Sequence, residues 1–189
     1  MSRWEPDARE RLERAALELF LEQGFAQTSV PQITARAGLT TRTFFRHFAD
    51  KREVLYADDE EVPAMVARMM AEAPPDAEPL ALIVEGLQTV AETRFEPRKA
   101  ALLARRELVR SDTGLQERDL RKRASMSAAI QEGFRSRGFD ELTATLAART
   151  AVTVLNVSID RWLSQDDGPP LTDLVTETLA VLRALLAGP

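Results

Sequence analysis

The sequence contains no cysteine and only one histidine, His47. The first absence excludes disulfides and thiolate chemistry, and the second excludes a metal site built from several histidines. Uninterrupted apolar runs stay well short of the roughly 18 residues that a membrane-spanning helix requires. The charged first residues, MSRWEPDARER, also lack the apolar segment of a secretory signal. We therefore expect a cytoplasmic protein without a membrane partner.

Catalytic signatures are missing as well. The chain has neither a glycine-rich loop that would hold phosphates nor a Gly-x-Ser-x-Gly turn that would present a nucleophile. The four contiguous carboxylates from Asp58 to Glu61 would point around a helix instead of converging on one ion. We expect no enzymatic activity, no cofactor and no metal site.

Negative charge is absent from one stretch of an otherwise acidic chain. The 189 residues carry a net charge of −5, yet the stretch from Thr28 to Phe48 contains no carboxylate. Between Phe25 and Lys51 there are four cations and one carboxylate, a net charge of +3. This reversal suits a surface that contacts nucleic acid, although a solvated basic helix face would carry the same charge. The residue types in the stretch decide between the two.

Helical periodicity with clear stops runs through nearly the whole chain. Apolar residues recur at helical spacing from Arg9 to Leu21, and Gly24 ends that helix. Ser29 stands three residues before Gln32 and forms a capping box for a second, short helix, which Gly38 ends. No alternating strand pattern interrupts the later segments. The sequence therefore predicts an all-α protein of about nine helices.

The N-terminal helices are expected to form a domain of their own. A fourth helix is predicted from Lys51, capped by Asp50, with a break or kink at Pro63. Beyond that point the helices are longer and more apolar. We expect a three-helix N-terminal domain over residues 1–56 and a larger helical domain over residues 57–189.

The second and third helices have the form of a helix-turn-helix motif. They are short, and a tight turn at Gly38 joins them. Phe44 and Phe48 are expected to anchor the third helix on the others, which leaves its remaining face open. Hydroxyl and guanidinium groups on that face can donate to phosphate oxygens and to base edges. The open face carries Thr40, Thr41, Arg42, Phe45 and His47.

The order of residues in this stretch is distinctive: TSV at 28–30, Ile33, AGLT at 37–40, TFFRHF at 43–48 and KREVL at 51–55, after a helix that ends ALELFLEQGF. In spacing it resembles the tetracycline-repressor-like (TetR) family of bacterial transcriptional regulators. The resemblance covers about the first 56 residues and is specific. The rest of the chain resembles the family only in its helical architecture.

The resemblance implies a ligand-responsive regulator, in most cases a repressor, which binds a palindromic double-stranded DNA operator as a homodimer and is released by a small molecule. Two recognition helices one DNA turn apart require such a two-fold dimer. The alternative is a helical scaffold or ligand carrier that keeps the fold without binding DNA. The expected DNA-contacting residues are Thr28, Arg36, Thr40, Thr41, Arg42, Thr43, Phe45, His47 and Lys51.

The sequence departs from the family pattern at three positions. Thr34 stands where the family commonly has alanine, and Arg42 stands where glycine is frequent. Phe45 replaces a common tyrosine whose hydroxyl contacts phosphate in relatives. Phe45 cannot form that hydrogen bond, but it can offer an apolar contact to a thymine methyl or a sugar. Whether Arg42 contacts a base or a phosphate is left open.

The last predicted helix carries an apolar stripe at three- and four-residue spacing. In TetR-like proteins the last two helices pair with those of a second copy, so the stripe is expected to serve the homodimer. One face of the preceding helix is needed for the core of the protomer. The stripe consists of Leu171, Leu174, Val175, Leu179, Leu182, Leu185 and Leu186.

The helices in between are expected to enclose a small-molecule effector. Methionines suit an adaptable apolar wall, although each is as well explained by core packing, and polar groups set in apolar sequence suit orientation. The segments "RRELV", "AAIQEGFRSRG" and "IDRWL" resemble actinobacterial regulators that sense acyl-CoA-type molecules, which favours an anionic thioester. Asp160 instead favours a cationic or hydrogen-bond-donating ligand. The expected ligand-contacting residues are Met65, Met69, Met126, Asn156 and Asp160.

Overall fold

The structure is a computed structural model that describes residues 8–56 and 62–187. Within these ranges the regular elements are all helices, without a β-strand, which confirms the all-α class. The carboxylates from Asp58 to Glu61 lie outside the described residues. The chain divides into two compact units, of which the first is Met1–Glu60 with Ala104–Leu120 and the second is Glu61–Leu103 with Arg121–Pro189.

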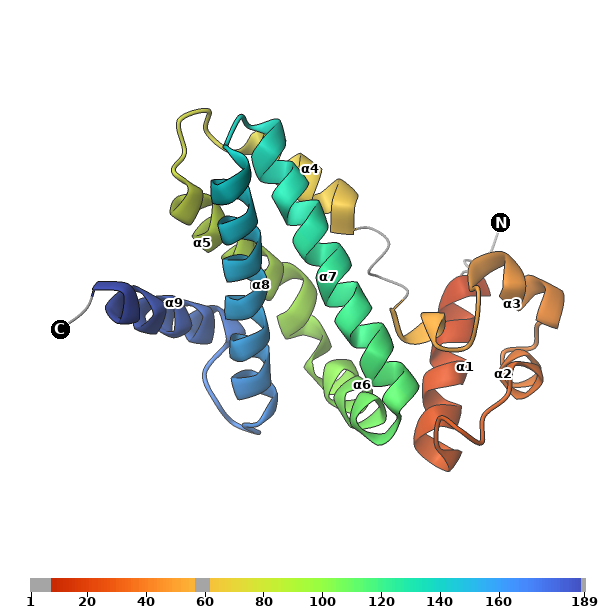
Figure 1. Ribbon diagram of the computed structural model, residues 1–189. Coiled ribbons are helices and arrows are strands. Elements are labelled where there is room, and N and C mark those ends of the chain that lie inside the picture. The colour runs from red at the N-terminus through yellow and green to blue at the C-terminus, as the bar shows by residue number, and fades with distance from the viewer. Residues whose placement is uncertain (1–7, 57–61, 188–189) are drawn as a thin grey trace, which may run out of the picture. The chain divides into compact units, whose positions relative to one another are not determined.

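The first unit is built on three helices, α1 (Ala8–Gln23), α2 (Val30–Arg36) and α3 (Thr41–His47), which pack on one another (Figure 1, red to orange). Gly24 and Gly38 follow α1 and α2 with φ angles of 87° and 64°, a backbone conformation that glycine adopts without strain. The helices share one apolar core. Its fully buried members on these helices are Leu12, Ala16, Phe20, Ile33 and Phe44.

The first unit also includes residues 104–120, which no pattern in the sequence assigns to it. The hydroxyl of Tyr56 donates to the carbonyl of Leu115 at 3.0 Å, and both residues are buried. Glu53, also buried, forms an ion pair with Arg118. These contacts join residues far apart in sequence, so periodicity along the chain does not show them.

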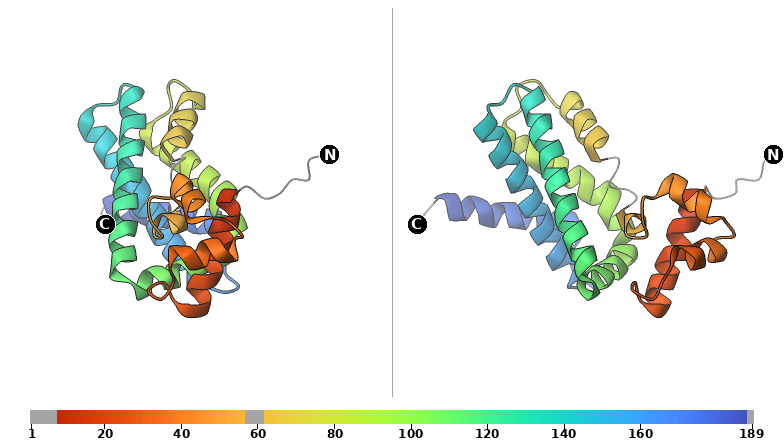
Figure 2. Two further views of the ribbon diagram at one scale, coloured as in Figure 1. Left: turned by 90° about the vertical axis from the view of Figure 1, so that its right-hand side faces the viewer. Right: turned by 45° about the vertical axis from the view of Figure 1, so that its right-hand side comes forward.

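The second unit is a helical bundle around α8, which packs against α5 and α9 (Figure 2). Among the described residues, α8 is the one helix long and apolar enough to cross a membrane by length and composition, and its buried side chains pack into the core of the unit. The later helices of the chain are α4 (Val62–Glu72), α5 (Pro79–Val90), the π-helix η2 (Ala91–Phe95), the 3-10 helix η3 (Glu96–Arg98), α6 (Lys99–Ser111), α7 (Thr113–Ser136), α8 (Glu141–Leu163) and α9 (Leu171–Ala187).

The prediction of a helix that begins at Lys51 is wrong. Asp50 caps only a short 3-10 turn over residues 53–56, and α4 begins at Val62. Pro63 is the second residue of α4, where its missing N–H would have had no partner within the helix. The predicted kink at Pro63 stays a prediction, because residues 57–61 lie outside the described ranges.

Candidate nucleic-acid interface

The start and end of α2 are fixed by side chains. The Ser29 hydroxyl accepts from the Gln32 N–H, and the Gln32 side-chain oxygen accepts from the Ser29 N–H at 2.8 Å, which confirms the capping box. Pro31 lies in the first turn. At the other end, the Arg11 guanidinium of α1 donates to the carbonyl of Ala37 at 2.6 Å. Both ends of this seven-residue helix are thus held.

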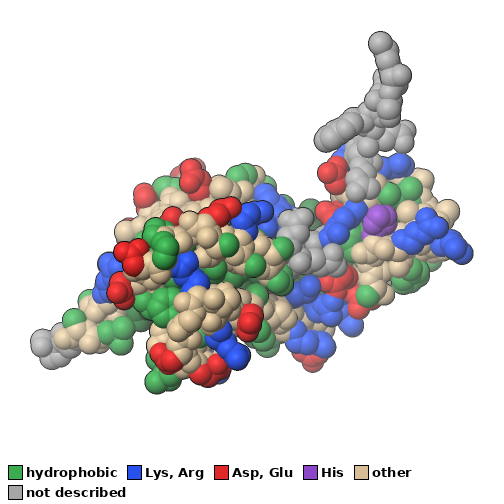
Figure 3. Space-filling view, turned by 90° about the horizontal axis from the view of Figure 1, so that it is seen from above, with side chains coloured by type: hydrophobic (Ala, Val, Ile, Leu, Met, Phe, Trp, Pro, Cys, Tyr) green, Lys and Arg blue, Asp and Glu red, His purple; other side chains and the backbone are tan. Residues whose placement is uncertain are grey.

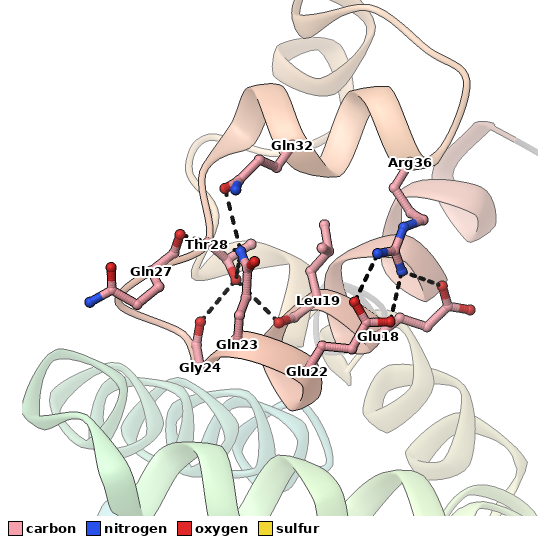
Figure 4. A network of polar contacts seen from close by, with 9 residues as sticks. All are labelled: Glu18, Leu19, Glu22, Gln23, Gly24, Gln27, Thr28, Gln32 and Arg36. Carbon is pink, nitrogen blue, oxygen red and sulfur yellow. Dashed lines mark hydrogen bonds and ion pairs between the residues drawn. The ribbon is translucent and has the colours of Figure 1, made fainter.

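Thr28 belongs to the interior of the first unit (Figure 4). It is 2% exposed, and its hydroxyl lies 2.9 Å from the carbonyl oxygen of Gly24 and 3.3 Å from that of Leu19. The side-chain amide of Gln23 donates to the same hydroxyl at 3.1 Å. The expectation that this side chain contacts DNA is therefore corrected, because the hydrogen bonds of Thr28 stabilise the loop between α1 and α2.

Arg36 is paired with carboxylates of α1 (Figure 4). Its two terminal nitrogens donate to the two Glu22 oxygens at 2.9 and 2.8 Å, and one of them lies 3.3 Å from Glu18. The hydrogen bond from Arg36 lowers the pKa of Glu22, and that same bond raises the pKa of Arg36. The predicted DNA contact is not supported, because two carboxylates neutralise the guanidinium and tie α2 to α1.

Lys51 is also directed into its own unit. Its ammonium donates to the carbonyls of Phe25 and Thr28, each at 2.8 Å, and lies 4.3 Å from the centre of the Phe25 ring. Desolvation lowers the pKa of Lys51. Two of its three donors hold the α1–α2 loop, so the predicted phosphate contact has at most one donor left.

α3 is seated by its two phenylalanines and capped by Thr40. The Thr40 hydroxyl accepts from the Thr43 N–H at 3.1 Å, and the two hydroxyls lie 2.9 Å apart. Phe44 is fully buried and Phe48 is 2% exposed, with their rings 5.4 Å apart. This confirms the expected anchoring and fixes which face of α3 is open.

The open face of α3 carries positive charge and no negative charge. Thr41, Arg42 and Arg46 are exposed, Phe45 is 60% exposed, and His47 is half-buried. Within the described residues, neither Arg42 nor Arg46 has a carboxylate partner. In Figure 3, Lys and Arg side chains lie on both sides of the single histidine. Sequence reasoning missed Arg46, although its spacing of four residues from Arg42 on a helix was a usable signal.

The five residues expected to contact an effector do not all come together. Met65 and Met69 lie half-buried on α4, and the sulfur of Met65 accepts from Arg94 at 3.5 Å. Met126 packs partly buried against the core of the second unit. Asn156 is half-buried, but Asp160 is exposed on α8. The expectation that Asp160 contacts an effector enclosed by the helices is therefore corrected. Sequence reasoning missed Arg94, which the π-helix η2 places beside Met65.

The apolar stripe of α9 is divided between two roles. Leu171, Leu174, Val175 and Leu179 are buried in the core of their own protomer, which corrects the view of the stripe as one dimer surface. Other apolar side chains of α8 and α9 remain exposed in the protomer. They are Leu142, Leu146 and Val157 on α8, and Val181, Leu185 and Leu186 on α9.

The geometry defines a class of protein. A short, doubly capped helix followed by a tight turn and a second helix with an open, cationic face is a helix-turn-helix. Residues 13–57 match the family model described as bacterial regulatory proteins, tetR family. The chain is also 56% identical over 46 residues to the HTH-type transcriptional regulator TcmR of Streptomyces glaucescens, a match that covers 24% of this chain and 20% of that relative.

Solved structures resemble the chain over nearly its whole length. The TetR-family repressor FadR of Thermus thermophilus, in complex with lauroyl-CoA, has a TM-score of 0.58 and 24% identity, covering 93% of both chains. NalD of Pseudomonas aeruginosa, the secondary repressor of the MexAB-OprM multidrug efflux pump, has a TM-score of 0.60 and 20% identity, covering 93% of this chain and 94% of NalD. Residues 13–57 thus match the TetR family of bacterial regulatory proteins, and the chain as a whole has the fold of these solved structures.

Proposed function

We propose that this protein is a cytoplasmic, ligand-responsive transcriptional repressor that binds a palindromic DNA operator as a homodimer. The observation that carries the proposal is the open face of α3, on which Arg42 and Arg46 have no carboxylate partner in the described part of the chain. Charged side chains are normally satisfied by a partner or by water, and a row of cations cleared of carboxylates suits a polyanion. The family match over residues 13–57 favours DNA as that polyanion.

The residues of the interface take different roles in this proposal. Arg46 and His47 contact phosphates, while Thr41 and Arg42 lie where a recognition helix reads base edges. Thr40 caps the helix by accepting from the Thr43 N–H, and the hydroxyls of both residues lie at its start. Thr28, Arg36 and Lys51 act within the domain, because their polar groups are already engaged there.

Selection of binding sites from random duplexes tests the proposal. We expect enrichment of a palindrome whose half-site centres are about one DNA turn apart. The second candidate function, a helical scaffold or ligand carrier without DNA binding, predicts no enrichment even at low salt. Recovered operators would also indicate which genes the protein controls.

The homodimer is proposed to form through the exposed apolar side chains of α8 and α9. Leu185 is 75% exposed in the protomer, so Leu185→Glu costs the isolated protomer little but buries a charge in such an interface. We expect a folded monomer in analytical ultracentrifugation, with at least tenfold weaker operator affinity. The control is Leu120→Glu, at a leucine that is 66% exposed outside these two helices. A dimeric Leu185→Glu variant would place the interface elsewhere.

The effector is proposed to be a small, largely apolar molecule that contacts Met65 and Met69 of α4. Half-buried methionines give an adaptable wall, and Arg94 adds one positive charge beside it. An anionic headgroup beside Arg94 therefore suits this wall better than a cationic ligand, because Asp160 is exposed. The lauroyl-CoA bound to the Thermus protein is an example of such a molecule.

The effector class is tested by operator release in the presence of lauroyl-CoA, lauric acid or neutral dodecanol. We expect the two anions to release operator at lower concentration than the alcohol, and Arg94→Leu to remove that preference. Equal release by all three, or a preference that survives Arg94→Leu, would contradict an anionic effector at this wall.

A further inference from the structure

Phe45 stands out because it is the large apolar side chain on the open face of α3. It is 60% exposed, whereas its neighbour Phe44 is fully buried. The two rings lie 5.4 Å apart at 82°, an edge-to-face contact that supports the Phe45 ring from one side. An aromatic ring exposed to this extent contributes little to the core. Its place on the open, cationic face of α3 suits a role in binding.

The surroundings of Phe45 indicate the occupant. Thr41 and Arg42 precede it by one helical turn and therefore share its face, and Arg46 follows directly. No carboxylate pairs with either arginine in residues 8–56 or 62–187. An apolar group beside cations that lack a carboxylate partner in the described residues suits a surface with anionic edges and one apolar point. The major groove offers such a surface where a base carries a methyl group.

We propose that Phe45 is a specificity-determining residue that selects thymine in each operator half-site through the 5-methyl group of the base. A phenyl ring cannot donate or accept a conventional hydrogen bond, so it reads no donor or acceptor pattern. Among the four bases, thymine alone presents a methyl group in the major groove. This inference rests on the proposed DNA-binding function and assigns one part of its sequence preference.

The size of the effect follows from the area that a methyl group removes from water. Burying a group of this size contributes about 0.8 kcal/mol, a factor of about four in affinity. An operator bound by a dimer has two such contacts. Removing both methyl groups should therefore weaken binding roughly fifteenfold.

The test is a deoxyuridine scan of the selected operator. Each thymine is replaced symmetrically in both half-sites by deoxyuridine, which deletes the 5-methyl group and keeps base pairing. We expect one position at which the unmodified protein loses roughly fifteenfold in affinity, and we expect Phe45→Ala to be indifferent to the same replacement. Leu21→Ala, at a 56% exposed leucine of α1, is the control and should keep the full sensitivity.

Two results would overturn the inference while leaving the proposed function intact. One is a half-site at which no deoxyuridine replacement weakens binding. The other is a Phe45→Ala variant that is as sensitive to deoxyuridine as the unmodified protein, or that loses affinity equally for all duplexes. A uniform loss would indicate that the ring contacts deoxyribose. Failure to select any operator would overturn the proposed function and this inference together.

Discussion

The two helices of the helix-turn-helix have the same length, but their arginines differ in whether carboxylates pair with them. In α2, Arg36 is exposed but held by Glu18 and Glu22 of α1, so carboxylates of its own domain neutralise its charge. In α3, Arg42 and Arg46 are exposed and have no carboxylate partner in the described residues. The comparison teaches that cations counted along the sequence are not equivalent: one group positions the motif, and the other is available to a polyanion.

Removing the α3 cations should have the largest effect on DNA binding. With Arg42→Ala and Arg46→Ala combined, the dimer loses four contacts. At about 1 kcal/mol each, the low end of the expected range, operator affinity should fall roughly 1000-fold. Unfolding should change little, because both side chains are exposed. Fluorescence anisotropy at fixed salt measures the affinity, and a loss smaller than about fivefold would show that α3 is not the reading helix.

Lys51→Ala should act mainly on stability. The substitution removes two hydrogen bonds from a charged donor and leaves the carbonyls of Phe25 and Thr28 without it, which should cost about 1–3 kcal/mol in the free energy of unfolding. Denaturant unfolding measures this loss. At temperatures where the variant is fully folded, the slope of operator affinity against salt should stay within about 0.5 of the original. A slope that falls by about one per protomer would restore Lys51 as a phosphate contact.

Removing the carboxylate partners of Arg36 should make α2, like α3, present a cation that is available to DNA. Glu18→Gln with Glu22→Gln removes both carboxylate partners, so the guanidinium becomes available and the domain gains two units of positive charge. We expect affinity for a non-specific duplex at low salt to rise severalfold. Glu10→Gln with Glu13→Gln changes the net charge of α1 equally without touching Arg36. An equal rise in that control would attribute the effect to net charge alone.

The smallest effect concerns pH. The hydrogen bond from Arg36 lowers the pKa of Glu22 in the folded state below its usual value of 4.5. A carboxyl with a depressed folded pKa contributes stability that is present above its unfolded pKa and is lost as the pH falls through its folded pKa. Glu22→Gln should therefore reduce the loss of stability between about pH 5 and pH 3 by a small amount, since the pair is exposed. Identical pH profiles for the two proteins would contradict the pairing.

Local signals in the sequence predicted much of this fold. The Ser29–Gln32 capping box and the glycines after α1 and α2 act within one turn of the chain, and each was found where it was expected. The same logic failed after Asp50, because a cap-like pair can close a 3-10 turn as well as begin a helix. Local rules therefore located the recognition helix but not the start of α4.

The partners of the site residues required the structure. Arg36 and Glu22 are 14 residues apart, and Lys51 and Phe25 are 26 apart, so their contacts depend on how α1, α2 and the following turn pack. From the sequence alone, Arg36 and Lys51 look as available as Arg42. The open face of α3 was more predictable, because helical spacing with two buried phenylalanines determines which side chains remain outside.

The most direct test compares the salt dependence of operator affinity for two variants. Arg46→Gln removes one cation of α3, and Arg36→Gln with Glu22→Gln removes one charge of each sign from the α1–α2 pair. For Arg46→Gln we predict that the slope of log affinity against log salt becomes shallower by about 0.9 per protomer, near two for the dimer. For the charge-balanced pair we predict an unchanged slope. An equal flattening by both variants would contradict the division of charge between α2 and α3.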